Sequence, residues 1–246
     1  MSGKVFEDVM INAGEIKSKE PLLIEGFPGI GLVGNIASQQ IIEELSMEYI
    51  GSMESRFFPP IAVLYDGLIN MPVRIYESEE HNLIMVVSDI PISPSSSYDV
   101  SKVLINWAGS IGVKEVISIA GIATMSDEAK VFGAATTKDM LEKIENHVEI
   151  FQMGTISGIS GSIMSECFIQ EIPAISLLGA TRSQNPDPRA AAAVINVLND
   201  LYGYSIETES LIEQAERIEL EMQKLAEDLR KSEQSASPRR EFPMYG

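Results

Sequence analysis

Two glycine-rich segments carry the residue types from which phosphate-binding and nucleophilic sites are built. The first, Gly29-Ile30-Gly31-Leu32-Val33-Gly34, matches the G-x-G-x-x-G pattern of dinucleotide sites, follows an apolar strand and opens a helix. Pro28 interrupts the approach from that strand, and the acidic residue expected about 20 positions on is matched only loosely, by Glu48 and Glu54. We therefore interpret the segment as a tight strand-to-helix crossover, in which glycine permits positive φ and close packing. The glycines of this crossover are Gly26, Gly29, Gly31 and Gly34.

The second segment, Gly158-Ile159-Ser160-Gly161-Ser162, resembles a nucleophile elbow but lacks its last glycine. A serine hydrolase needs a histidine base, and the two histidines, His81 and His147, lie in polar stretches typical of solvated loops. The single cysteine, Cys167, lies in an apolar helix, which favours a buried structural role. No Cys/His cluster has metal-ligand spacing, and the P-loop pattern is absent. The sequence thus predicts no enzymatic activity, no metal and no cofactor.

One enzymatic alternative stays open at this stage. The glycine-rich turns at 29–34 and 157–162 each precede a helix, and the free N–H groups of a helix N-terminus can bind an anion. A nucleoside phosphorylase-like or ligase-like enzyme would use such a site. The sequence offers no evident base or nucleophile for either reaction.

The composition describes an acidic globular chain. Of its 246 residues 36 are acidic and 18 are basic, and the formal charge of −18 repels phosphate backbones, which argues against nucleic-acid binding. No apolar run reaches the roughly 18 residues of a membrane span, and the N-terminus shows no signal segment. A single cysteine fits a reducing cytoplasm. We interpret the acidic runs at Glu77, Glu79 and Glu80 and at 213–221 as solvated faces.

The hydrophobic pattern alternates between strands and helices. Apolar runs predict strands at 21–26, 61–65, 73–76, 83–87, 116–121, 131–135 and 174–179, with a hairpin turn between the second and third. Helical periodicity covers 33–45, 95–112, a segment around 140–144, and 162–170. A last helix begins after Asp187 and ends at Gly203, because Asp caps a helix N-terminus and Pro188 fits its first position. This alternation predicts a three-layer α/β/α sandwich over residues 1–206.

From residue 207 the pattern changes to that of one amphipathic helix, 207–233. Its apolar residues recur at steps of about 3.5, as in a coiled-coil seam. Two interpretations stand side by side: an intersubunit bundle that makes the protein a homo-oligomer, and a terminal helix docked on its own domain. Residues 234–246 begin as a polar stretch, which predicts a flexible tether. The seam residues are Leu211, Ala215, Ile218, Met222, Leu225 and Leu229.

The last residues depart from the polar character of the tether. Glu241-Phe242-Pro243-Met244-Tyr245-Gly246 places apolar and aromatic side chains at the carboxyl end. A tyrosine ring buries a large area with few rotatable bonds, its hydroxyl can hydrogen-bond, and a terminal carboxylate can pair with a lysine. Pro243 pre-extends the segment and lowers the entropy cost of docking. We therefore predict that Met244, Tyr245 and Gly246 dock into a pocket on a partner; the alternative is a scaffold protein whose terminal aromatic residues fold back on its own body.

Four further segments are informative in combination: Glu25-Gly26-Phe27-Pro28-Gly29-Ile30-Gly31-Leu32-Val33-Gly34, Val131-Phe132-Gly133-Ala134-Ala135-Thr136, Gly154-Thr155-Ile156-Ser157-Gly158-Ile159-Ser160-Gly161 and Pro186-Asp187-Pro188-Arg189-Ala190-Ala191. Through these segments the sequence resembles the proteasome assembly chaperone family, in particular its archaeal members, over nearly the whole folded part. The resemblance implies a phosphorylase-like sandwich and a homo-oligomer that binds the α-ring of the 20S proteasome without ATP, as assembly chaperone or as gate-opening activator. Met244-Tyr245-Gly246 matches the hydrophobic-Tyr-X docking tail of that family.

Overall fold

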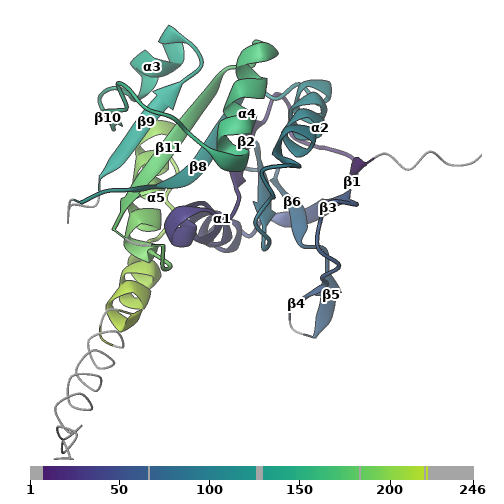
Figure 1. Ribbon diagram of the computed structural model, residues 1–246, viewed down its shortest axis with the longest axis horizontal. Helices are drawn as coiled ribbons and strands as arrows, with labels where there is room; N and C mark the ends of the chain where they lie inside the picture. Colours follow the sequence, from purple (N-terminus) through teal and green to yellow (C-terminus); the bar gives the residue numbers. More distant parts are fainter. Residues whose placement is uncertain (1–7, 66, 126–129, 183, 219, 221–246) are drawn as a thin grey trace, which may run out of the picture.

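A computed structural model describes residues 8–65, 67–125, 130–182, 184–218 and 220 of the chain (Figure 1). Most of its strands, over these residues, form a single mixed sheet. The spatial order of that sheet is β1 (Val9–Ala13), β3 (Glu48–Ser55), β6 (Val73–Ser78), β7 (Leu83–Ser88), β2 (Leu22–Gly26), β8 (Glu115–Ala123), β11 (Ala174–Thr181), β9 (Val131–Ala135) and β10 (Glu149–Ile150). The central strands β7, β2, β8 and β11 are parallel, and antiparallel pairing begins at β6 on one side and at β9 on the other.

The central strands are buried on both faces. Every residue of β2, β7 and β11 is buried, which explains their nearly continuous apolar sequences. Successive side chains point to opposite faces, so Leu23 lies in one core and Ile24 in the other. The sheet therefore needs a helical layer on each side.

Helices supply these two layers (Figure 1). On one face lie α1 (Val33–Glu44), α3 (Lys138–Ile144) and α5 (Pro188–Tyr202), and on the other α2 (Ser97–Ser110) and α4 (Gly158–Ile169). The predicted three-layer α/β sandwich is thus confirmed. Among the described residues, no helix combines the length and the apolar character that crossing a membrane requires.

The caps predicted for α5 are confirmed. The side chain of Asp187 accepts a hydrogen bond from the N–H of Ala190 at 3.0 Å, and Pro188 occupies the first helical position. Gly203 ends the helix with a φ of 72°, and its N–H donates to the carbonyl oxygen of Asn199 at 2.8 Å. Both ends of α5 are therefore fixed by residues close to one another in the sequence.

The predicted hairpin has the wrong second strand. β4 (Val63–Tyr65) pairs with β5 (Leu68–Asn70), whereas residues 73–78 form β6 in the main sheet. Gly67 has a φ of 79°, which allows the chain to reverse within two residues. The reversal therefore comes earlier than the apolar run at 73–76 suggests.

Three further features differ from the sequence pattern. The pattern does not predict β1 and β3, which mix polar and apolar residues near one edge of the sheet. Helix α4 begins at Gly158 rather than at Ser162, so Gly161 lies within its first turn. A Cβ at Gly161 would collide with the carbonyl oxygen of Ile156, which explains why glycine is needed there. The solvated interpretation of Glu77 is wrong, because this carboxylate is buried and accepts the N–H groups of residues 17 and 18 at 2.9 and 2.8 Å.

Candidate functional site at the glycine-rich crossover

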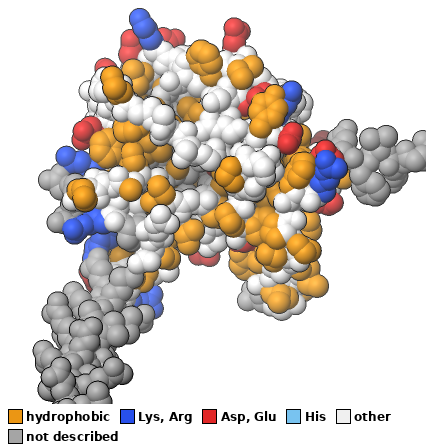
Figure 2. Space-filling view, viewed as in Figure 1, with side chains coloured by type: hydrophobic (Ala, Val, Ile, Leu, Met, Phe, Trp, Pro, Cys, Tyr) orange, Lys and Arg blue, Asp and Glu red, His pale blue; other side chains and the backbone are white. Residues whose placement is uncertain are grey.

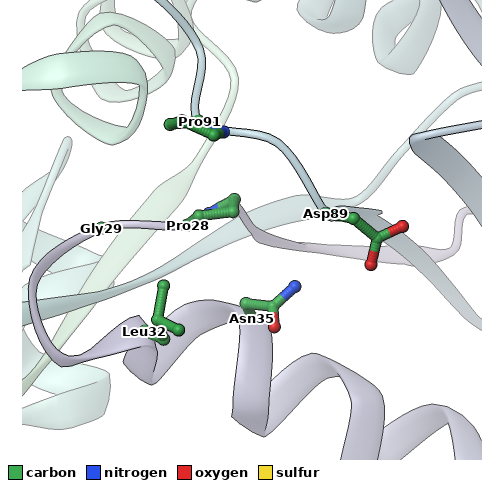
Figure 3. A pocket seen from close by; sticks show the side chains of 6 residues that line it. All are labelled: Pro28, Gly29, Leu32, Asn35, Asp89 and Pro91. Carbon is green, nitrogen blue, oxygen red and sulfur yellow. The ribbon is translucent and has the colours of Figure 1, made fainter. Parts of the chain in front are cut away.

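The glycine-rich crossover lies at the carboxyl edge of the parallel strands. β2 leads through it into α1 on one face of the sheet, whereas the neighbouring β7 leads into α2 on the opposite face. Ligands of open α/β sheets bind at such a switch point. A hollow of about 350 Å³ opens there (Figure 3), and its lining residues are Pro28, Gly29, Leu32, Asn35, Asp89 and Pro91.

The crossover glycines are required for backbone packing at three of four positions. A Cβ at Gly26 would collide with the carbonyl group of Gly34, and a Cβ at Gly34 with the carbonyl oxygen of Ile119. Gly31 has a φ of 64°, which strains any residue with a side chain. Gly29 differs, because its backbone is extended and no atom lies within 4 Å of the place a Cβ would take.

Two polar groups around this hollow form internal hydrogen bonds. The N–H of Leu32 donates to the carbonyl oxygen of Gly29 at 3.0 Å, within a 3-10 turn. The Asn35 amide donates to the carbonyl oxygen of Ser88 at 2.6 Å. The charged residue of the lining is Asp89, whose carboxylate repels a phosphate. Among the described residues, the side chains that line the hollow therefore supply no positive charge for an anion.

Asp89 itself is part of a buried network. The buried Arg74 forms an ion pair with Asp89 and donates to the hydroxyl of Tyr65 at 3.0 Å, and that hydroxyl donates to Asp89 at 2.9 Å. Arg74 also donates to the hydroxyl of Tyr76 at 2.9 Å. Burial opposes the charge on Arg74, but the hydrogen bond to Asp89, together with the charge interactions with Tyr76, Asp89 and Tyr65, outweighs burial and raises the pKa of Arg74. Asp89 is thus a structural acid rather than a free general base.

A second pocket, of about 280 Å³, lies between the crossover and the N-terminus of α4. Two of its lining residues, Phe27 and Ser160, hydrogen-bond to the fully buried carboxyl group of Glu25. The hydroxyl of Ser118 donates to the same group. Burial outweighs these hydrogen bonds and raises the pKa of Glu25 to about 7. The carboxyl group of Glu25 therefore titrates well above the range of an exposed glutamate.

Nucleophilic chemistry lacks its partners at this second pocket. Ser160 is buried against Glu25, while His81 shares a hydrogen bond with the hydroxyl of Ser78 at 2.9 Å and His147 is exposed. Burial, followed by the charges of Glu25 and Glu166, raises the pKa of Cys167 to about 12, so its thiol is not activated. No group of three His, Cys, Asp or Glu side chains in the described ranges could hold a metal ion.

Comparison with known proteins assigns the family. The PAC2 family matches residues 23–226, most of the chain. The chain belongs to the PAC2 family. It is 35% identical over 235 residues to protein MJ0106 of Methanocaldococcus jannaschii, a match that covers 96% of this chain and 97% of the relative.

Solved structures of the same fold include two proteins of Pyrococcus furiosus. PbaA, described as an archaeal homolog of proteasome-assembly chaperone, superposes with a TM-score of 0.84 at 32% identity and covers 93% of this chain and 95% of its own. PbaB, described as an archaeal proteasome activator, superposes with a TM-score of 0.79 at 25% identity, over 89% of this chain and 99% of its own. The central sheet with helices on both faces is therefore the fold of this family.

The PAC2 match extends into the helix predicted from residue 207. Residues 209–218 and 220 are helical, and Leu211 and Ala215 are buried, Leu211 within the core that contains α1 and α5. The Gln40 side chain of α1 donates to the carbonyl oxygen of Glu207 at 2.8 Å. The first turns of this helix thus pack on their own domain. Of the other seam residues, Ile218 is half-buried, and Met222, Leu225 and Leu229 lie outside the described residues.

The predicted docking residues of the PAC2 chain, Met244, Tyr245 and Gly246, also lie outside the described residues, so their docking stays a prediction.

Sequence reasoning missed the Glu25 network. A signal for it was present, since Glu25 interrupts the apolar run of β2 and Ser118 interrupts that of β8. A charged residue inside a strand buried on both faces needs buried hydrogen-bond partners.

Proposed function

We propose that this chain is an ATP-independent proteasome-binding protein, an assembly chaperone or a gate-opening activator of the 20S core. The observation that carries the proposal is a hydrophobic-Tyr-X sequence, Met244-Tyr245-Gly246, in a PAC2-family chain related to PbaA and PbaB. Those two structures are described as a homolog of proteasome-assembly chaperone and as a proteasome activator. The proposal extends that role to this chain.

The tail docks into pockets between adjacent subunits of the proteasome α-ring. Tyr245 supplies the buried ring and the hydroxyl, and the carboxylate of Gly246 supplies a charge for a lysine at the base of the pocket. The acidic character of the chain, with a formal charge of −18, favours approach to a basic docking surface. A homo-oligomer presents several tails at once, and effective concentration then raises the overall affinity.

The engaged state of the crossover supports a non-enzymatic role. Asp89 is paired with Arg74, Glu25 is fully buried, and the Cys167 thiol has a raised pKa. The nucleoside phosphorylase-like or ligase-like alternative needs a cation for its anionic substrate and a base for its nucleophile, and the described residues that line the two crossover pockets include no lysine, arginine or histidine.

The experiment compares the full chain with a variant that lacks Met244 to Gly246. We expect deletion to abolish co-sedimentation with archaeal 20S particles and to remove any effect on their peptide hydrolysis, because both anchors are lost. Unchanged co-sedimentation and unchanged hydrolysis would show that the tail is not the docking element. The oligomeric mass of the deletion variant is measured in parallel, so that a loss of assembly is recognised.

A matched pair of insertions tests the carboxylate itself. One alanine added after Gly246 displaces the carboxylate from its lysine, whereas one alanine inserted after Ser235 lengthens the tether and leaves the last three residues intact. We expect the first insertion to weaken binding about tenfold or more, as loss of a charge-assisted hydrogen bond does, and the second to leave it unchanged. Equal binding by both would contradict an anchoring role for the carboxylate.

A further inference from the structure

One exposed surface plays no part in the crossover or in the proposed tail contact. Residues 57–70, which we call the arm, leave the main sheet after β3, form the β4–β5 hairpin and return towards β6 (Figure 1). Leu64 and Ile69 are paired directly opposite each other, so both side chains lie on the same face of the hairpin. Their exposed fractions are 67% and 76%, and that of Leu68 is 70%. The arm is a projecting apolar surface, seen as the orange protrusion in Figure 2.

The base of the arm is held firmly to the body. Tyr65 of β4 receives a hydrogen bond from the buried Arg74 and gives one to Asp89, at 3.0 and 2.9 Å. The guanidinium group of Arg74 also lies 4.6 Å from the centre of the Tyr65 ring. An arm anchored by buried charged groups loses little conformational entropy when a partner covers it. This geometry distinguishes the arm from a loose surface loop.

The arm is nearly free of charge in a strongly charged chain. From Phe57 to Asn70 its sequence contains a single charged residue, Asp66, whereas the whole chain carries 36 acidic residues and a formal charge of −18. Two copies of such a chain repel each other through their net negative charge. Contact between copies is least opposed where the charge is absent.

We propose that the arm packs against a second copy of this chain and forms its principal subunit interface. Permanent interfaces between identical subunits are more apolar than transient ones, and the Leu64, Leu68 and Ile69 side chains have that character. A stable interface uses roughly 20–30 residues a side, of which the arm supplies 14 over residues 57–70. The remainder comes from the neighbouring surface of the body.

The C-terminal helix is less suited to this role over its described part. Leu211 and Ala215, the first two residues of the predicted seam, are buried in their own domain and offer no surface to another subunit. We therefore assign to the arm the role of subunit interface that the sequence pattern suggests for the helical seam. The inference goes beyond the proposed proteasome contact, because self-association is measured without the proteasome.

The test measures mass in solution by light scattering at micromolar concentration. We expect the wild-type chain to be an oligomer, and the double variant Leu64→Glu/Ile69→Glu to approach the monomer mass of 26.9 kDa. Ile169→Glu is the matched control, because Ile169 is also an exposed isoleucine, 68% accessible, at the end of α4. Circular dichroism verifies that all variants are folded. A monomeric wild type, an unchanged mass of the double variant, or an equal loss of mass in Ile169→Glu would overturn the proposal.

A second measurement uses a substitution that introduces no charge. Cys167 is the sole cysteine and is fully buried, so a thiol introduced at the surface is labelled selectively. We expect the thiol of Ile69→Cys to react with a maleimide about tenfold more slowly than that of Ile169→Cys, because the second copy covers it. Equal labelling rates would contradict coverage of the arm.

Discussion

The crossover and the arm use polar and apolar side chains in opposite ways. At the crossover, polar groups of Glu25, Asn35 and Asp89 are turned inward and hydrogen-bonded, although it occupies the switch point where α/β proteins bind ligands. On the arm, Leu64, Leu68 and Ile69 remain exposed, although their type belongs in a core. The side chains at the crossover, where the sequence resembles an enzyme site, are thus hydrogen-bonded within the chain. The apolar side chains of the arm, in contrast, remain accessible to a partner.

Arg74 connects the two regions, since its partners Asp89 and Tyr65 belong to the crossover hollow and to the arm. A sequence motif at a known location in a fold does not by itself identify a functional site. Groups without a partner in their own chain are the better indication. Substitutions at Arg74, Gly34 and Glu25 test this distinction.

Arg74→Met removes the shared anchor and leaves Asp89 partly buried without its cation. We expect the free energy of unfolding to fall by about 4 kcal/mol, the range typical of breaking one side of a buried ion pair. Urea unfolding measures it. Lys17→Met is the control, because its ion pair with Glu48 is exposed to solvent and contributes little to stability. Equal stability of the two variants would show that Arg74 anchors nothing.

Gly34→Ala places a Cβ against the carbonyl oxygen of Ile119 and forces the crossover backbone to move. We expect a loss of about 3 kcal/mol, as in overpacked cores. Gly29→Ala should remain within about 0.5 kcal/mol of the wild type, because no atom lies within 4 Å of the place that its Cβ would take. If thermal unfolding finds the two substitutions equally harmful, the crossover glycines are not distinguished by packing.

Glu25→Gln removes the titration of the buried carboxyl group. Because burial raises the folded-state pKa from 4.5 to about 7, the group favours folding when protonated, and its contribution is lost as the pH rises from about 4.5 through 7. The wild type should lose about 2 kcal/mol more than the variant between pH 5 and pH 7. Urea unfolding at both pH values measures this difference. A wild type and a variant with the same pH dependence would contradict a neutral, buried Glu25.

Sequence periodicity located most buried elements because their determinants are local. The strands β2, β7, β8 and β11 are apolar runs, and the ends of α5 follow from Asp187, Pro188 and Gly203. The crossover was also recognised, since glycine at Gly26, Gly31 and Gly34 signals positive φ or close approach. The choice between a crossover and a nucleotide site required only that Pro28 and the missing acid be taken into account.

Pairing between segments far apart along the chain could not be predicted from the sequence. The edge strands β1 and β3 have no strong pattern, because they pair at one side of the sheet with segments far along the chain. The sequence pattern indicates a solvated Glu77, because the backbone N–H groups that it accepts belong to Lys17 and Ser18, 60 and 59 residues away along the chain. The same holds for the contact between Glu25 and Ser118, 93 residues apart.

Residue types and short spacings along the chain were sufficient to indicate the fold class, the family and the chemistry of the carboxyl-terminal tripeptide. Which polar groups are hydrogen-bonded and which apolar groups are left exposed depends instead on the tertiary structure. Burial and hydrogen-bond partnership arise between segments brought together by folding, and no local window of the chain contains both partners.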